Sequence, residues 1–152
     1  VLALADGLSE EPDRIAALHA LSARILGAVP YETGQTESMT TAEEAIAIGK
    51  GVCQDHAQIF IAAARSQGIP ARYVSGYLMI NDQIAQDATH AWAEAHVDGL
   101  GWVGFDVSNG VSPDEKYVRI AVGRDARDAA PTEGLRMGTA SEQMIVSLQV
   151  QQ

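Results

Sequence analysis

The sequence predicts an α+β domain in which helices precede an antiparallel sheet. Apolar residues recur with a helical period up to about residue 67 and alternate with a period of two from residue 71 onward. An Asp98-Gly99 turn signal separates two of the alternating segments, as is typical of an antiparallel hairpin. The 152 residues suffice for one hydrophobic core, so we expect a single domain over residues 1–152.

Two longer helices are expected at residues 10–29 and 53–67, because each segment places apolar residues on one face. Ser9 is the candidate N-cap of the first helix, and Pro30 marks its end. Gly68 is the candidate C-cap of the other, since glycine adopts the left-handed conformation that often ends a helix.

A short helix is expected between these two, ending near Ile48. Either Thr40 or Thr41 can open it, because Glu43 and Glu44 stand three residues after them. Both registers therefore offer a capping box, in which the threonine and glutamate side chains each accept from the other's backbone N–H group.

The alternating segments are the expected strands. They are residues 71–80, 89–97, 102–107, 117–122 and 143–150. In the second of them His90, Trp92, Glu94 and His96 fall on one face, since successive side chains of a strand point to opposite sides. Both Trp92 and Trp102 are expected in the core rather than in a substrate groove.

The charge balance bears on partners and compartment. The chain has 20 acidic and 10 basic residues, a net charge of −10, and the basic residues form no run. We therefore expect no nucleic-acid partner and no anionic membrane surface. No signal peptide opens the sequence, and a single thiol, Cys53, fits a reducing compartment, so a cytoplasmic location is expected.

Cys53 is the candidate nucleophile. It follows Gly49 and Gly51, which allow a tight turn, and it begins the helix expected at 53–67. The unpaired N–H groups and the positive dipole end of a helix N-terminus stabilise a thiolate, and the same N–H groups can hold an oxyanion. The alternative is an inert buried thiol, which composition alone favours.

A catalytic thiolate needs a base and a group that orients that base. If the strands on either side of the hairpin turn pair, His90 can lie opposite Asp106 and Trp92 opposite Gly104. His90 would then be the general base and acid for Cys53, and Asp106 would fix its tautomer.

Five strings carry a family resemblance over residues 31–150. GKGVCQDHA (49–57), GIPARYVSGY (68–77), THAWAE (89–94) and GWVGFDVSNG (101–110) resemble, in this order, motifs of the transglutaminase-like superfamily. GRDARDAAPTEG (123–134) is similar to a tail found in bacterial transglutaminase-like cysteine proteases. The resemblance implies Cys53 as nucleophile, His90 as base and Asp106 as orienting group.

The same resemblance implies a papain-like core, with the cysteine at a helix N-terminus packed on an antiparallel sheet. It implies thiol-dependent acyl transfer on amide or peptide substrates through a thioester. Hydrolysis is expected, because the bacterial relatives are described as proteases; a protein-glutamine transglutaminase with an amine acceptor is the alternative. A non-catalytic binding module, a partner-dependent enzyme and an arylamine acetyltransferase are the other readings. Bacterial members usually carry a further β-rich N-terminal region, so the chain is expected to be a fragment.

Residue 56 departs from the resemblance, since the family commonly has an aromatic residue where His56 stands. A solvent-facing or hydrogen-bonded structural histidine is expected there. A zinc site could combine Cys53, His56, His90 and His96, but no second local pair completes the pattern of a structural site. We expect no metal and no cofactor.

Three smaller questions remain open in the sequence. Tyr31, Gln35 or Gln54 could supply a second oxyanion donor, and no argument from the sequence chooses among them. Asp55 is expected to be a favourable charge in the first helical turn. Neither the oligomeric state nor the physiological substrate can be predicted.

Overall fold

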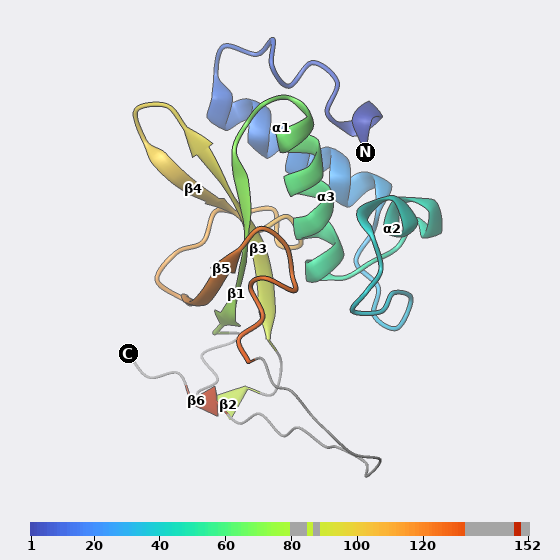
Figure 1. Ribbon diagram of the computed structural model, residues 1–152, viewed down its shortest axis with the longest axis vertical. Coiled ribbons are helices and arrows are strands. Elements are labelled where there is room, and N and C mark those ends of the chain that lie inside the picture. The colour runs from blue at the N-terminus through green and yellow to red at the C-terminus, as the bar shows by residue number, and fades with distance from the viewer. Residues whose placement is uncertain (80–84, 87–88, 133–147, 150–152) are drawn as a thin grey trace.

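The computed structural model describes residues 1–79, 85–86, 89–132 and 148–149 (Figure 1). The helical elements are η1 (Leu2–Leu4), α1 (Arg14–Ala28), α2 (Ala42–Ile48) and α3 (Cys53–Ser66). The strands are β1 (Ala71–Leu78), β2 (Ala85–Gln86), β3 (His90–Val97), β4 (Gly101–Phe105), β5 (Tyr117–Gly123) and β6 (Leu148–Gln149). Helices therefore precede the sheet, and the expected α+β class is confirmed.

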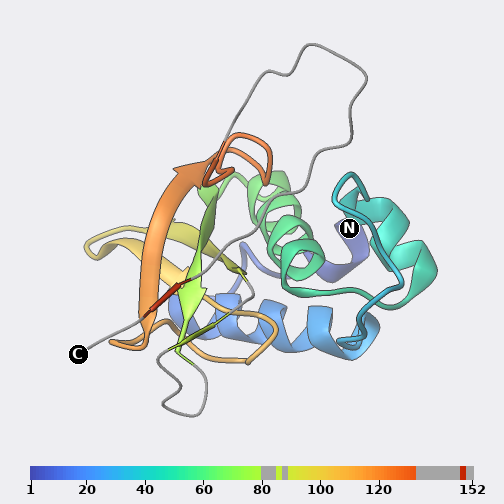
Figure 2. The ribbon, with the colours of Figure 1, turned by 90° about the horizontal axis from the view of Figure 1, so that it is seen from below.

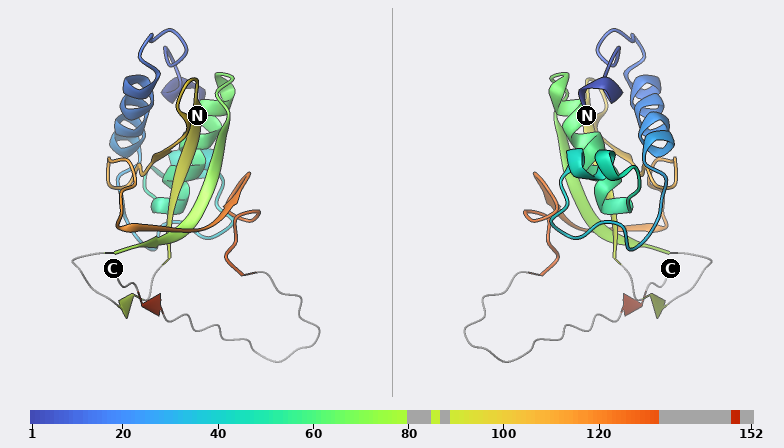
Figure 3. Two further views of the ribbon diagram at one scale, coloured as in Figure 1. Left: turned by 90° about the vertical axis from the view of Figure 1, so that its left-hand side faces the viewer. Right: turned by 90° about the vertical axis from the view of Figure 1, so that its right-hand side faces the viewer.

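Four strands form an antiparallel sheet in the order β4-β3-β1-β5, and β2 pairs separately with β6. Helix α3 packs directly on β3 and β1, and α1 packs on α3 and reaches β4. Figures 2 and 3 show both helices on the same side of the sheet, with β5 at the edge that lies away from α1.

Small side chains allow α3 to approach the sheet closely. The residues of β3 that face the helix are Ala91, Ala93 and Ala95, and all three are buried in the core. Phe60 of α3 stacks on Phe105 of β4, with ring centroids 5.1 Å apart. Alanines on the strand and one aromatic pair beside them set the distance between the helix and the sheet.

The first helix begins later than the sequence predicts. Asp13 is the N-cap, and its carboxylate accepts a hydrogen bond from the backbone N–H of Ala16 at 3.0 Å. A start at Ser9 would put Glu11 inside the helix, directly before Pro12, where the proline ring disfavours the helical conformation. The expectation of Ser9 as the N-cap was therefore wrong.

The other two helices begin and end close to the expected positions. Thr41 opens α2 with a complete capping box: the Glu44 N–H donates to the threonine hydroxyl at 3.3 Å, and the Thr41 N–H donates to the glutamate at 2.8 Å. Cys53 begins α3 as expected. Gly68 adopts a φ of 73° directly after the C-cap Gln67, which ends the helix.

The strands agree with the prediction to within three residues at each end, with one part that cannot be compared. Most of the strand expected at 143–150 lies outside the described residues, within which Leu148–Gln149 forms β6. Trp92 is buried as expected, but Trp102 is 42% exposed, so its placement in the core was wrong. Trp102 instead lies under the Arg72 guanidinium, 4.1 Å from its ring centroid, in a cation–π contact.

Candidate active site

The turn that delivers Cys53 is held by Asp55. The Asp55 carboxylate accepts from the backbone N–H of Val52 at 2.8 Å and from the Thr36 hydroxyl at 2.6 Å. A Cβ at Gly51 would lie 2.9 Å from the Asp55 side chain, so only glycine allows this close approach. Asp55 is thus a buried brace for the turn as well as a favourable first-turn charge.

A second segment is fixed to the same turn. Tyr31 forms an isolated parallel bridge with Gly51, in which the Glu32 N–H donates to the Gly51 carbonyl at 2.8 Å. The Gly51 N–H donates in turn to the Pro30 carbonyl at 3.3 Å. This bridge holds Tyr31 beside the start of the helix that carries Cys53.

His90 and Asp106 meet at the ends of neighbouring strands. His90 is the first residue of β3, and Asp106 directly follows β4; the distance from His90 Nε2 to Asp106 Oδ2 is 2.6 Å. The Asp106 carboxylate is buried and also accepts from the Asn109 amide at 2.6 Å and from the Tyr117 hydroxyl at 2.8 Å. The sequence reasoning missed Asn109 and Tyr117, although Asn109 stands three residues after Asp106, within reach for a turn.

The register of the hairpin differs from the expected one by two residues. Glu94 lies opposite Gly104, so the expected pairing of Trp92 with Gly104 was wrong. The loop between the strands is centred on Gly99, whose φ is 82°, so the turn that Asp98-Gly99 predicted is present. A shift of two residues keeps each side chain on its original face, which is why His90 still reaches Asp106.

The thiol of Cys53 joins this pair. It lines the same cleft as the His90 ring, and because Asp106 occupies Nε2, Nδ1 is the nitrogen left for the sulfur. Burial by itself lowers the pKa of His90, but the hydrogen bonds and negative charges of Asp106 and Cys53 outweigh it and raise that pKa to about 9. The imidazole is therefore protonated at neutral pH and faces the thiol as a cation.

The pKa of Asp106 is held below its ordinary value. Burial alone raises this pKa. The hydrogen bond and charge of His90, together with the hydrogen bonds of Asn109 and Tyr117, lower it by more than burial raises it. Asp106 is thus an anion that both orients and stabilises the His90 imidazolium.

Cys53 and His90 border a cleft of about 390 Å³, and Asp106 bonds the His90 ring without lining the cleft itself. Its lining includes Tyr31, Val52, Cys53, Gln54, Tyr73, Ser75, Thr89, His90, Ala91, Ala126, Ala130 and Pro131. A larger hollow of about 610 Å³ lies on α2 and the loop before it, over residues 35–48, away from the thiol. The smaller cleft is the candidate active site because it alone of the two holds the thiol and the imidazole.

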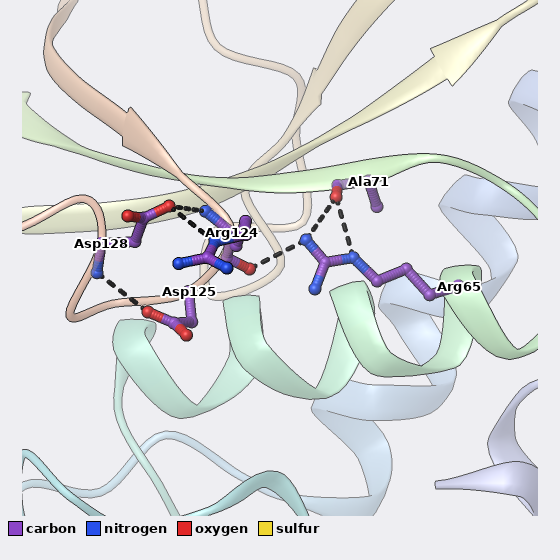
Figure 4. Close-up of polar contacts among 5 residues, drawn as sticks. All are labelled: Arg65, Ala71, Arg124, Asp125 and Asp128. Carbon is purple, nitrogen blue, oxygen red and sulfur yellow. Dashed lines mark hydrogen bonds and ion pairs between the residues drawn. The ribbon is translucent and has the colours of Figure 1, made fainter.

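One wall of the cleft is the loop of residues 124–131. Figure 4 shows Arg65 reaching from α3 to this loop, where it donates to the Arg124 carbonyl at 2.9 Å and to the Ala71 carbonyl at 2.8 Å. The loop closes on itself through Arg124 and Asp128, whose side chains lie 3.2 Å apart. These contacts fix the wall to both the helix and the sheet.

His56 is buried outside the cleft, consistent with the hydrogen-bonded structural role expected for it. Its Nε2 lies 2.7 Å from the Val29 carbonyl, and its Nδ1 lies 2.8 Å from the Ser108 hydroxyl. Burial lowers its pKa, although the nearby carboxylates of Asp55 and Asp106 raise it in part.

The structure does not assemble the zinc set that the sequence allowed. His56 is committed to its two partners, and His96 lies near the far end of β3, 3.9 Å from Asp98. Among the described residues, no group of three or more His, Cys, Asp and Glu side chains is placed to hold a metal ion. That the protein needs no metal or cofactor remains a prediction.

The three candidates for a second oxyanion donor are now separated. Gln35 lines the larger hollow, and its amide donates to Glu32 at 3.0 Å. Gln54 lines the cleft, but its amide donates to the Ser38 carbonyl at 2.8 Å. Tyr31 lines the cleft beside Cys53, and burial together with the negative charges of Cys53 and Asp106 raises its pKa, so it remains a hydrogen-bond donor.

A family model for the transglutaminase-like superfamily matches residues 2–107, a range that contains Cys53, His90 and Asp106. The chain belongs to the transglutaminase-like superfamily. An uncharacterized protein of Mycobacterium tuberculosis is 35% identical in a 143-residue alignment, and the match covers 88% of this chain and 45% of that protein. The chain therefore spans about half the length of the curated relatives it matches.

Solved structures of transglutaminase-like proteins share the fold. The crystal structure of a candidate cysteine protease from Cytophaga hutchinsonii is 30% identical with a TM-score of 0.77, and the match covers 99% of this chain and 50% of that one. The periplasmic domain of TgpA from Pseudomonas aeruginosa is 26% identical with a TM-score of 0.55, over 72% of this chain and 43% of that one. These likenesses support a cysteine-dependent enzyme.

The described residues contain no helix that is both long and apolar enough to cross a membrane. The compartment expected from the sequence remains a prediction.

Proposed function

We propose that this transglutaminase-like domain catalyses thiol-dependent acyl transfer on amide bonds of peptides or proteins, with hydrolysis as the outcome. The observation that carries the proposal is the His90 ring, which lines the same cleft as the Cys53 thiol and lies 2.6 Å from the Asp106 carboxylate through Nε2. Asp106 keeps the ring protonated and oriented, and the protonated ring stabilises a thiolate on Cys53.

In the first half of the reaction the Cys53 thiolate attacks the amide carbonyl carbon and a C–S bond forms. The His90 imidazolium then donates its Nδ1 proton to the departing nitrogen, the C–N bond breaks, and the amine leaves. The acyl group remains on Cys53 as a thioester, and His90 is left neutral.

In the second half water attacks the thioester carbonyl while neutral His90 removes a proton from it. The C–S bond breaks, the carboxylic acid leaves, and the thiolate and imidazolium are restored. An amine in place of water would give transamidation by the same steps.

The oxyanion of each tetrahedral intermediate lies near the start of α3. Cys53 and Gln54 are the first two residues of the helix, where backbone N–H groups have no intrahelical acceptor. The Tyr31 hydroxyl, which lines the cleft beside Cys53, supplies the third donor. Donors held in place before the reaction begins stabilise the charge without reorganisation.

Hydrolysis is favoured over transamidation by the relative from Cytophaga hutchinsonii, which is described as a candidate cysteine protease. Its match covers nearly all of this chain at 30% identity. The choice between the two outcomes depends on which second acceptor enters the cleft.

The test begins with the thiol itself. The alkylation rate of Cys53 by iodoacetamide is measured from pH 5 to pH 10 in the wild type and in His90→Ala. In the wild type we expect alkylation to persist well below the pH at which a free thiol reacts. In His90→Ala we expect this reaction at low pH to be lost. A wild-type profile like that of a free thiol, unchanged in His90→Ala, would contradict the proposal.

Turnover is then measured on a library of fluorogenic peptide amides, with and without a primary amine, and Cys53→Ala is the control. Release of the fluorophore without amine incorporation supports hydrolysis, and incorporation of the amine supports transglutamination. An activated thiol without turnover on any substrate would point to an enzyme that requires a partner.

A further inference from the structure

His56 spans three segments of the candidate site. Its own backbone belongs to the first turn of α3, three residues after Cys53. Its Nε2 reaches the Val29 carbonyl at the end of α1, two residues before Tyr31, and its Nδ1 reaches Ser108, two residues after Asp106. The ring is 0% exposed, so both contacts are made without water.

The partners define which nitrogen carries the hydrogen in the neutral ring. A carbonyl oxygen can only accept a hydrogen bond, so Nε2 carries the hydrogen. In a neutral imidazole Nδ1 is then an acceptor, and it receives the Ser108 hydroxyl hydrogen. The neutral ring therefore satisfies both partners, and no other single tautomer does.

The Ser108 end of this contact bears directly on Asp106. The turn after β4 is closed by a two-way backbone bridge between Asp106 and Val111, with N–O distances of 2.8 and 3.2 Å. The Asn109 N–H also donates to Asp106 Oδ1, at 3.3 Å. Because the turn is held together internally, a hydrogen bond to Ser108 places the Asp106 carboxylate as well.

We propose that neutral His56 is a positioning residue that ties the Cys53 helix to the turn carrying Asp106, so that the His90–Asp106 pair meets the thiol in its reactive arrangement. This inference rests on the proposed function, because it concerns the geometry of the same thiol and imidazole. His56 does not touch the substrate and acts only through Ser108 and Val29.

Protonation of His56 weakens this tie. The added hydrogen on Nδ1 forces the Ser108 hydroxyl to turn from donor to acceptor, and it leaves a cation in a buried site. The ionisable groups around the ring are the carboxylates of Asp55 and Asp106, the Tyr31 phenol, whose ring packs edge-on at 6.2 Å, and Cys53 one turn away. The carboxylates favour the cation, but burial opposes it more strongly, so the tie holds at neutral pH.

The test compares three variants by the pH profile of Cys53 alkylation with iodoacetamide. His56→Phe keeps an aromatic ring without the hydrogen bonds, and Ser108→Ala removes one partner. His56→Gln keeps an amide donor and an acceptor but gains no proton. His96→Gln, on the far end of β3, is the matched histidine control.

We expect His56→Phe and Ser108→Ala to slow alkylation at pH 7 about tenfold, since each leaves a buried polar group unpaired. We expect His56→Gln to be alkylated at nearly the wild-type rate at pH 7. As the pH falls, its rate should decrease less than that of the wild type, because glutamine gains no proton. His96→Gln should follow the wild type at every pH.

A folded Ser108→Ala with the wild-type profile overturns the inference, whatever His56→Phe does. Ser108→Ala therefore decides the question if His56→Phe does not fold, as judged by circular dichroism. Failure of the proposed function is seen separately, because the alkylation profile of His90→Ala would then be the same as that of the wild type. A profile that responds to His90→Ala but not to Ser108→Ala keeps the function and removes the role of His56.

Discussion

His90 bonds Asp106 and His56 bonds Ser108 of the same turn, and the environments of the two rings have opposite effects on their protonation. Both rings are largely removed from water, which by itself lowers the pKa of each. His90 has a carboxylate 2.6 Å from Nε2 and shares its cleft with the Cys53 thiol, and its pKa rises to about 9. His56 has a carbonyl and a hydroxyl as partners, and its pKa falls.

The difference teaches that burial alone does not decide whether a histidine is charged. A neutral dipole stabilises a buried imidazolium by less than burial destabilises it, whereas a full negative charge in contact stabilises it by more. One fold thereby keeps a cation beside its thiol and a neutral ring as a brace a few residues away.

Removing the charge on Asp106 should have the largest effect on the difference between His90 and His56. Asp106→Asn keeps the side-chain shape but not the anion, so the pKa of His90 should fall and peptide amide turnover should drop by about 10³–10⁴-fold. The kcat/KM of each variant on a fluorogenic peptide amide checks this. Asp98→Asn, at the exposed His96–Asp98 pair, is the matched control and should leave turnover unchanged.

A second prediction uses the opposite signs of the two shifts. The folded pKa of His90 lies above the 6.5 of a free imidazole, so its stabilisation is complete below pH 6.5 and is lost as the pH rises to about 9. That contribution is about 3 kcal/mol at most. For His56 the folded pKa lies below 6.5, so stability falls as the pH drops below that value.

Urea unfolding of the wild type, His90→Ala and His56→Gln between pH 5 and pH 9.5 measures both effects. The stability difference between wild type and His90→Ala should shrink above pH 6.5. The difference between wild type and His56→Gln should shrink below it. If the two differences depended on pH with the same sign, the contrast between the rings would be wrong.

Tyr31 is near both His56 and the thiol, since its ring packs on His56 and it lines the cleft beside Cys53. Tyr31→Phe keeps the ring contact and removes only the hydroxyl. We expect kcat to fall about 10²-fold, as for other oxyanion donors, with little change in KM. Alkylation by iodoacetamide forms no oxyanion, so its rate should stay at the wild-type value; a parallel fall would assign Tyr31 to thiol activation instead.

The smallest expected effect concerns Tyr117, whose hydroxyl donates to Asp106 at 2.8 Å. Tyr117→Phe removes one of the hydrogen bonds that hold the pKa of Asp106 down. Turnover should fall about tenfold or less, and the acid limb of the pH–rate profile should move to higher pH. An acid limb at the wild-type position would show that the remaining partners of Asp106 suffice.

The parts of the fold that depend on local chemistry were predictable from the sequence. Thr41 with Glu44, Gly68 after α3 and the two-residue alternation from residue 71 each act within a few residues, so the pattern alone indicates the structure. The N-cap of α1 was missed because the choice of Ser9 left out the effect of Pro12 on the residue before it.

The site divides in the same way. Cys53 at a helix start and the shared face of His90 and Asp106 follow from spacing and alternation, and the resemblance assigned their roles. The partners of His56 and the position of Tyr117 beside Asp106 depend on contacts between segments distant in the chain. No periodicity encodes such contacts, since they are set by how the segments pack.

Gly123 ends β5 where the wall of the cleft begins, and a Cβ there would lie 2.6 Å from the backbone of Ala129. The backbone of the sheet thus packs directly on the backbone of the loop. The Ser75 hydroxyl also donates a hydrogen bond to the Ala129 carbonyl. This wall of the cleft is consequently held against the sheet by main-chain packing. Anyone wishing to change which acyl groups enter would alter the side chains at Ala126 and Ala130, which line the cleft, and leave the loop backbone as it is.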